Sequence, residues 1–460
     1  MRKTLRIMFL ASVTIIFSLC YLYADEPESL RQTVLTLEEC LKNALAHNPK
    51  VIQALSNVNL NKATLTEARS DYLPKVNTTI GFSHAESSKV SLAGISSGAA
   101  TLGLAKRSDT LSEETSIEQL LWDFGSVLNG MRLAKENLSS AEYSLLETQE
   151  DTILKAKTAY FMVLQAQLLT GIAKENLTQA KAHLLRAQGF YEVGLKQKYE
   201  VTRAQVDVSN ANLEYVTAMK NYELSKVTLN VIMGKIDNTA YTVQEITDIE
   251  LKDVEAGQAL SSAMENRVEI LKLKANVRAA ERKLDIDKKG NWPKVFVSAG
   301  QVSSDTNVKG IGSVHSWNAG VALKWPWFDG FKNSSKIKQT EENIKIAKSS
   351  AEELTFNIAF EVQDATLGLG EAKERIQLTD KTLQQANENF EILEARYKEG
   401  LSSTIELDDA RILMVSAKSN RVSALCDYLI SLAKYERSTG TIKEYAQKGV
   451  GFSNGPKRNN

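Results

Sequence analysis

Apolar residues recur along this chain at two different spacings, and each spacing predicts a different secondary structure. Over about residues 126–190 and 332–438 the spacing is three or four positions, as in Phe161, Leu164 and Leu168, which is typical of helices. No proline, a residue that breaks helices, lies between positions 75 and 292 or between 327 and 455. Sixty-five residues of helix would extend roughly 100 Å. Such a helix needs neighbours along most of its length, as in a coiled coil or a tube of helices.

Two short regions alternate with a period of two instead. In residues 316–325, Trp317, Ala319, Val321 and Leu323 face one way, whereas the other face carries small or polar side chains. Residues 76–83 alternate similarly. Strands with one apolar and one polar face, bordered by aromatic residues, are the signature of a transmembrane β-barrel. The sequence predicts strands at about 75–85, 110–121, 294–302 and 315–325.

The chain also repeats itself. Residues 122–125 (WDFG) resemble 328–330 (FDG), and residues 191–195 (YEVGL) resemble 397–401 (YKEGL), both at an offset of 206. Landmarks that keep their order and spacing indicate a duplication, in which each half reads helix, two strands, very long helix, tight turn and helix. The predicted helices are 125–193 and 199–234, then 331–399 and 404–438. The predicted parts of the chain are a first repeat at 25–240, a linker at 241–256, a second repeat at 257–440 and a tail at 441–460.

Four strands are too few to close a barrel, and an open sheet edge is not tolerated in lipid. If the strands span a membrane, they must therefore be pooled between copies of the chain. The predicted fold class is mixed and mainly α, with a tube of long helices continued by a β-barrel that several copies of the chain complete together.

Composition and the N-terminus narrow the function further. The chain has 56 basic and 56 acidic residues, which argues against a nucleic-acid groove. Arg2 and Lys3 precede an apolar run at 7–23, which predicts a secretory signal peptide over residues 1–24. Lipidation of Cys20 and a permanent N-terminal anchor remain alternatives. Cys40 and Cys426 lie in helical patterns, where small buried side chains are expected.

No catalytic grouping is present in the sequence. It contains no HExxH, P-loop or CxxC motif, and its four histidines are scattered. We therefore expect no enzyme activity, no cofactor and no metal centre, and we expect function to lie in a pore.

The combined pattern resembles the TolC family of bacterial outer-membrane efflux channels, over about residues 36–440. The residues that carry the resemblance are Leu37-Glu38-Glu39 through Asn48-Pro49, Tyr72-Leu73-Pro74, Leu121 to Gly125, Trp327 to Gly330, Arg396-Tyr397 with Gly400, and Glu406 to Ala410. The resemblance implies a homotrimer with a twelve-stranded barrel in the outer membrane and a tube of helices in the periplasm. It places 241–256 in an equatorial belt around that tube. It also implies two partners, a periplasmic adaptor and an inner-membrane transporter of the RND, ABC or MFS type, for passive export of small molecules or polypeptides.

The ends of the long helices are the candidate pore entrance. Gly194 and Gly400 fit the left-handed conformation that commonly ends a helix, and these turns would lie farthest from the barrel. Acidic residues follow both turns: Glu200 after the first, and Glu406, Asp408 and Asp409 after the second.

The resemblance places Glu406 and Asp409 in a ring of acids that constricts the periplasmic entrance, and Tyr397 matches the tyrosine of that gate. Ser402 departs from the arginine of some family members, which puts the closed-state bonds in doubt. Three copies of each acid around a narrow pore would favour cations. The alternative is that Glu406, Asp408 and Asp409 are first-turn acids that stabilise a helix N-terminus.

Trp122, Trp292, Trp325 and Trp327 lie at the helix-side ends of the predicted strands. An aromatic belt at the membrane interface is one interpretation, and a hydrophobic junction core is the other. Two competing functions also stay open: a periplasmic adaptor or coiled-coil scaffold without a pore, and a secreted enzyme.

Overall fold

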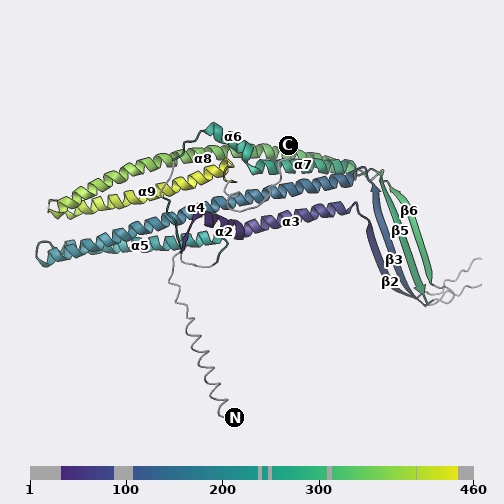
Figure 1. The fold of residues 1–460 in the computed structure, drawn as a ribbon, viewed down its shortest axis with the longest axis horizontal. Helices are drawn as coiled ribbons and strands as arrows, with labels where there is room; N and C mark the ends of the chain where they lie inside the picture. The colour runs from purple at the N-terminus through teal and green to yellow at the C-terminus, as the bar shows by residue number, and fades with distance from the viewer. Residues whose placement is uncertain are drawn as a thin grey trace, which may run out of the picture.

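The computed structural model describes residues 33–86, 107–236, 241–246, 251–307, 313–399 and 401–443. The predicted signal peptide, Cys20, Gly400 and residues 444–460 lie outside these residues. Long helices form an extended bundle, and a sheet lies at one end of it (Figure 1).

The four longest helices form two equivalent hairpins. Helices α4 (Ser126–Glu192) and α8 (Lys332–Lys398) have 67 residues each, and α5 (Lys198–Ile232) and α9 (Thr404–Ser438) have 35 each. Every boundary is offset by 206 residues between the two hairpins, as in the sequence repeat. The ends of these helices differ from the predicted ends by at most two residues.

Each half begins with two shorter helices, where the sequence pattern predicted one. They are α2 (Leu37–His47) and α3 (Pro49–Ser70) in the first half, and α6 (Ala256–Asn266) and α7 (Val268–Lys288) in the second. Asn48 and Arg267 interrupt the helices with extended backbone, at ψ 124° and 126°. Proline at the first position of α3 explains one break, because the residue before proline avoids helical conformation.

The sheet contains four antiparallel strands in the order β2-β3-β5-β6. They are β2 (Lys75–Glu86), β3 (Arg107–Trp122), β5 (Lys294–Thr306) and β6 (Val314–Lys324). Pairing extends β3 and β5 beyond the predicted strands, through polar residues that hide the alternation. The Asn307 side chain, for example, donates to Asp109 at 2.7 Å at the end of both strands. Strands β2 and β6 are the two edges of this sheet.

The helices keep the order of the strands. Next to the sheet the helical layer runs α3-α4-α7-α8, and farther away it runs α5-α4-α9-α8. Helix α3 thus begins where α5 ends, and α7 begins where α9 ends, with both pairs packed beside α4. Gly234 (φ +70°) lies against the His47 backbone at the first junction, and Gly440 (φ +73°) lies against the backbone of 266–267 at the second.

The main core lies at the level of these junctions. Its largest fully buried side chains include Tyr160 and Tyr428, and Cys40 and Cys426 are buried in it as free thiols. Two short parallel strands, β1 (Thr33–Leu35) and β4 (Tyr241–Val243), cover this core, and the Tyr160 hydroxyl donates toward the carbonyl oxygens of Leu35 and Gln244. The predicted linker at 241–256 therefore contributes a strand and part of the core.

Candidate functional site

The hairpin turns lie at the end of the bundle farthest from the sheet (Figure 1). Gly194 has φ +73°, and the backbone N–H of Leu195 donates to the Phe190 carbonyl at 2.9 Å. The Leu401 N–H makes the equivalent bond to the Arg396 carbonyl at 2.8 Å. Both bonds join a residue to the carbonyl five positions earlier, which is the Schellman ending of a helix.

Glu406 caps helix α9. Its backbone N–H donates to the Ser403 hydroxyl at 3.3 Å, and its carboxylate accepts the Ser403 N–H at 3.0 Å, which is a capping box. The Ser402 hydroxyl also donates to this carboxylate, at 2.7 Å. The bonds from Ser402 and Ser403 lower the pKa of Glu406. Glu406 thus has the geometry of the helix-end alternative while its side chain remains exposed.

Asp408 points into the protein. It is only 5% exposed, and its carboxylate lies 3.7 Å from Arg203 on α5 and 3.8 Å from Arg411 on α9. Burial, and next the charge of Asp207, raise the pKa of Asp408. In this conformation Asp408 joins the two hairpins and does not line a water-filled opening.

The other predicted gate residues lie near the same turns. Glu200 is half-buried, accepts a bond from Lys196 at 3.2 Å and contacts the Thr404 hydroxyl at 3.4 Å across the hairpins. The side chain of Tyr397 is half-buried, whereas that of Asp409 is exposed. Asp409 is therefore the predicted gate acid that is open to solvent and outside the capping box.

His183 on α4 belongs to this region, although sequence reasoning assigned it no role. It is 8% exposed, its ring centroid lies 6.1 Å from that of Tyr397, and its Nε2 atom has no hydrogen-bond partner. Burial lowers the pKa of His183, and the charge of Asp408 opposes this shift. Only its helical position, on the face that packs against the second hairpin, could have identified it.

The junction between sheet and helices is built twice by the same turn. Asp123 accepts the backbone N–H of Val127 at 2.5 Å, and Asp329 accepts that of Asn333 at 2.8 Å, which caps α4 and α8. Each aspartate is followed by one glycine and one phenylalanine, in opposite order, and all four of these residues have positive φ.

The four predicted interface tryptophans lie at this junction, each at least 47% exposed. Phe124 packs edge-on against Trp122 and Trp292, with ring centroids 5.9 and 4.9 Å away. Trp317, at 82% exposed, lies near the opposite end of the sheet, seven residues before the end of β6. The sheet therefore carries exposed aromatic residues toward both of its ends.

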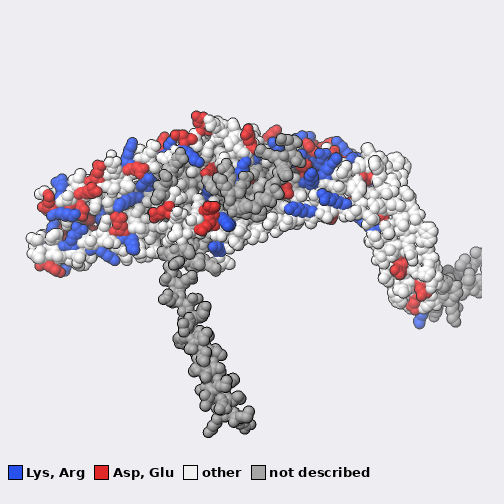
Figure 2. All heavy atoms as spheres, viewed as in Figure 1, with Lys and Arg blue, Asp and Glu red and all other residues white. Residues whose placement is uncertain are grey.

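Charged side chains lie mainly on the helices, whereas the sheet exposes mainly uncharged ones. Lys, Arg, Asp and Glu are scattered over the helices and are sparse on the strands (Figure 2). Register places Ile80 and Phe82 of β2 on the same face as Ile117 of β3 and Trp317 and Val321 of β6. Most of the large exposed apolar side chains of the sheet lie on this face, together with Glu113 and Gln301. The opposite face carries mainly small and polar side chains, with Phe296 and Val302 among them.

Two long helices carry exposed apolar stripes. On α8 the stripe consists of Phe356, Phe360, Leu367 and Leu378, which are 63–74% exposed. On α5 it consists of Val206, Leu213, Leu224 and Val231, which are 53–66% exposed. Spacings of 4, 7 and 11 keep residues on one helix face. We call these the α8 stripe and the α5 stripe, and both lie on helices at an edge of the layer.

Among the described residues, no group of three or more His, Cys, Asp or Glu side chains is placed to hold a metal ion. The same part of the chain contains no helix that is both long and apolar enough to cross a membrane.

Comparisons with known proteins fit this architecture. The chain is 21% identical to the outer membrane protein TolC of Vibrio cholerae, over 89% of this chain and 91% of that protein. It is 24% identical to the toluene efflux pump outer membrane protein TtgC of Pseudomonas putida, over 88% and 82%. The outer membrane channel CmeC of Campylobacter jejuni has a similar fold, with a TM-score of 0.75 at 17% identity, over 90% of this chain and 89% of that one.

The resemblance and the fold class predicted from the sequence are thereby confirmed. A family model described as outer membrane efflux protein matches residues 40–235 and 259–441, which is most of the chain. The chain belongs to the outer membrane efflux protein family.

Proposed function

We propose that three copies of this chain form one duct, with the sheets closed into a barrel in the outer membrane and the helices forming a tube in the periplasm. The observation that carries this proposal is the open four-stranded sheet, which bears most of its exposed apolar side chains on one face. Within the described residues, its edge strands β2 and β6 have no further strand beside them. Three such sheets supply twelve strands, enough for a closed barrel. The threefold rotation that relates the copies would also bring the α8 stripe of one copy toward the α5 edge of the next.

Export through this duct is passive, and the energy comes from partners. Proteins of this family act as the outer-membrane part of tripartite efflux systems. We infer a periplasmic adaptor and an inner-membrane transporter of the RND, ABC or MFS type as partners, with small molecules or polypeptides as cargo. An adaptor without a pore would have no use for the four-stranded apolar sheet.

The sheet-proximal tryptophans fit a role at the membrane surface. Trp325 and Trp327 are 59% and 83% exposed, although they adjoin the helical part. Rings this exposed in one copy suit the headgroup region, where aromatic side chains collect in barrels. Together with Trp122 and Trp292 they would form the periplasmic belt, and Trp317 would mark the outer one. We also infer that residues 1–24 are the export signal, and that 25–240 and 257–440 are the repeats joined by the equatorial linker.

At the far end, the turns would form the entrance, and we assign the roles of its acids separately. Asp409 would face the pore, Glu406 would cap α9 beside it, and Asp408 and Glu200 would hold the hairpins together behind it. Tyr397 would support this arrangement next to His183.

Changing Asp409 to asparagine is expected to weaken block by divalent cations, by about fivefold or more. A unit charge about 4 Å from an ion in water contributes about 1 kcal/mol, and three copies act together. Conductance and divalent block in planar bilayers measure this effect. Glu406→Gln is the matched control: glutamine can still accept the Ser403 N–H in the capping box, so block should remain almost unchanged. Equal block in D409N and the unsubstituted protein would remove Asp409 from the entrance.

A further inference from the structure

The junction between α9 and α7 differs from its repeat in one respect: it is built around buried charge. Helix α9 ends at Ser438 and α7 begins at Val268, and Lys443 donates to Asn266 at 2.8 Å across the join. At the corresponding junction of α5 with α3, Asn48 donates to the Ile232 carbonyl at 2.8 Å. The repeat offsets match Arg437 to Val231, and Arg267 to Asn48. The charged junction is thus specific to the second half.

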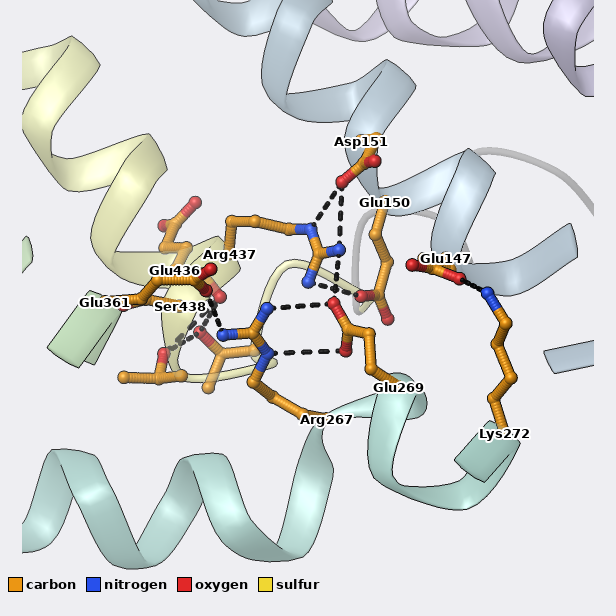
Figure 3. A network of polar contacts seen from close by, with 12 residues as sticks. Glu147, Glu150, Asp151, Arg267, Glu269, Lys272, Glu361, Glu436, Arg437 and Ser438 are labelled. Atoms are coloured by element: carbon orange, nitrogen blue, oxygen red, sulfur yellow. Dashed lines mark hydrogen bonds and ion pairs between the residues drawn. The ribbon is translucent and has the colours of Figure 1, made fainter. Parts of the chain in front are cut away.

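Arg437 is the centre of this junction (Figure 3). Its guanidinium contacts Asp151 at 2.9 Å and Glu269 at 2.7 Å. Arg267 pairs with Glu269 at 2.9 Å and also with Glu361 on α8. Helices α4, α7, α8 and α9 are therefore tied together at one level, where the sheet-side half of the tube meets the far half.

Glu150 on α4 is the member of this cluster whose charge is least compensated. It is 2% exposed, and its closest cationic atom is Nη1 of Arg437, at 3.3 Å. Neither oxygen of its carboxyl has a hydrogen-bond partner. The charged groups around Glu150, from every element packed there, are Glu147, Asp151, Arg267, Glu269, Lys272, Glu361, Glu436, Arg437 and Lys443. Glu436 is paired with Lys157 at 2.6 Å.

The nearby charges do not balance when Glu150 is ionised. Two guanidiniums then face the four carboxylates of Glu150, Asp151, Glu269 and Glu361, and Lys443 acts from farther away. Glu147 is neutralised separately by Lys272, at 2.7 Å. An uncompensated buried carboxylate is costly, whereas a protonated carboxyl has no charge and can donate a hydrogen bond.

The two buried glutamates consequently titrate in opposite directions. Burial raises the pKa of Glu150 to about 7, although Arg437 opposes this shift. Burial acts on Glu269 too, but its bonds to Arg267 and the charge of Arg437 outweigh it and lower its pKa to about 2. Glu269 therefore remains ionised over the range in which Glu150 takes up a proton.

We propose that Glu150 is a proton-binding switch that tightens the α9–α7 junction, and thereby stiffens the periplasmic tube at mid-height, when the surrounding pH falls below neutral. The proposal concerns the junction alone and does not depend on the roles assigned to the entrance acids.

The direction of the pH effect follows from the coupling between proton binding and the stability of the junction. An acid whose pKa is raised in the closed junction binds more protons there than in the opened chain. The closed junction therefore gains stability as the pH falls from about 7 toward about 4.5, the pKa of an ordinary glutamate. This gain is lost as the pH rises through about 7. Each pKa unit changes the equilibrium constant for opening the junction tenfold. Lowering the pH from about 8 to 5.5 should therefore raise the protection of its amides from hydrogen exchange on the order of 30-fold.

Hydrogen exchange of the full-length protein in detergent tests this directly. Amides of the last turns of α9 and the first turn of α7 should exchange on the order of 30-fold more slowly at pH 5.5 than at pH 8, after correction for intrinsic rates. In Glu150→Gln, the same amides should exchange at equal corrected rates at pH 5.5 and pH 8, because position 150 no longer titrates. Glu147→Gln, one turn away on the same helix, is the matched control and should keep the pH dependence.

A second measurement compares infrared spectra of the unsubstituted protein and E150Q, because the pKa of buried Asp408 is raised as well. The unsubstituted protein should gain a protonated-carboxyl band with a midpoint near pH 7 that E150Q lacks. The proposal is overturned if that band is absent above pH 6, or if E150Q keeps the pH dependence of the unsubstituted protein.

Discussion

Replacing Gly234 by alanine is expected to lower the free energy of unfolding by about 2–5 kcal/mol. Its φ of +70° costs an L-residue about 1–2 kcal/mol. A Cβ atom there would also lie 2.3 Å from the His47 carbonyl oxygen, and overpacking of this kind costs about 1–3 kcal/mol more. His47 ends α2 at the junction of α5 with α3, so the substitution would push two stacked helices apart.

Gly194 offers a matched control for this prediction. It has nearly the same conformation, φ +73°, but a Cβ atom there would meet nothing within 4 Å. Gly194→Ala should therefore cost only the conformational part, about 1–2 kcal/mol. The melting temperature of the detergent-solubilised protein, followed by helical circular dichroism, compares the two variants. Equal decreases would show that close contact at Gly234 contributes nothing.

Changing Phe356 and Phe360 together to glutamate should prevent assembly. These side chains are 74% and 73% exposed in one chain and belong to the α8 stripe. Burying a phenylalanine is worth about 1.5–3 kcal/mol, and each of the three interfaces would lose two. Six carboxylates would moreover have to leave water on assembly, which is costly.

The control keeps the same positions apolar. Phe356→Leu with Phe360→Leu should still assemble, with reduced thermal stability. Sedimentation in detergent separates the outcomes: mainly monomer for the glutamate pair and mainly trimer for the leucine pair. If the glutamate pair remained fully trimeric, the α8 stripe would face something other than a neighbouring copy.

The spacing of apolar residues in the sequence predicted which segments form helices and which form strands. The long helices follow from an uninterrupted apolar stripe without proline, and the offset of 206 residues predicts their duplication. A period of two located β2 and β6, whereas β3 and β5 completed the set of four and β3 alternates poorly. The ends of β3 and β5 were missed because the residues there do not alternate between apolar and polar. A hydrogen bond from Asn307 to Asp109 joins the two strands at this end instead.

The candidate site was predictable only in part, since burial and pairing depend on which helices become neighbours. The resemblance assigned Glu406 and Asp409 the same role at the entrance, yet Glu406 caps a helix and Asp409 remains exposed, while Asp408 between them is buried against Arg203. The Glu150 cluster was missed entirely, because it joins four helices that lie far apart in the chain. Its sequence signal is a set of charged residues where the other repeat has Val231 and Asn48.

The central claim is that one chain supplies only a third of a closed sheet wall. Native mass spectrometry of the full-length protein released from detergent micelles tests this most directly. We predict one dominant species, with the mass of three chains and with both helical and strand signals in circular dichroism. A folded monomer with the same strand content, stable in water without detergent, would contradict the account.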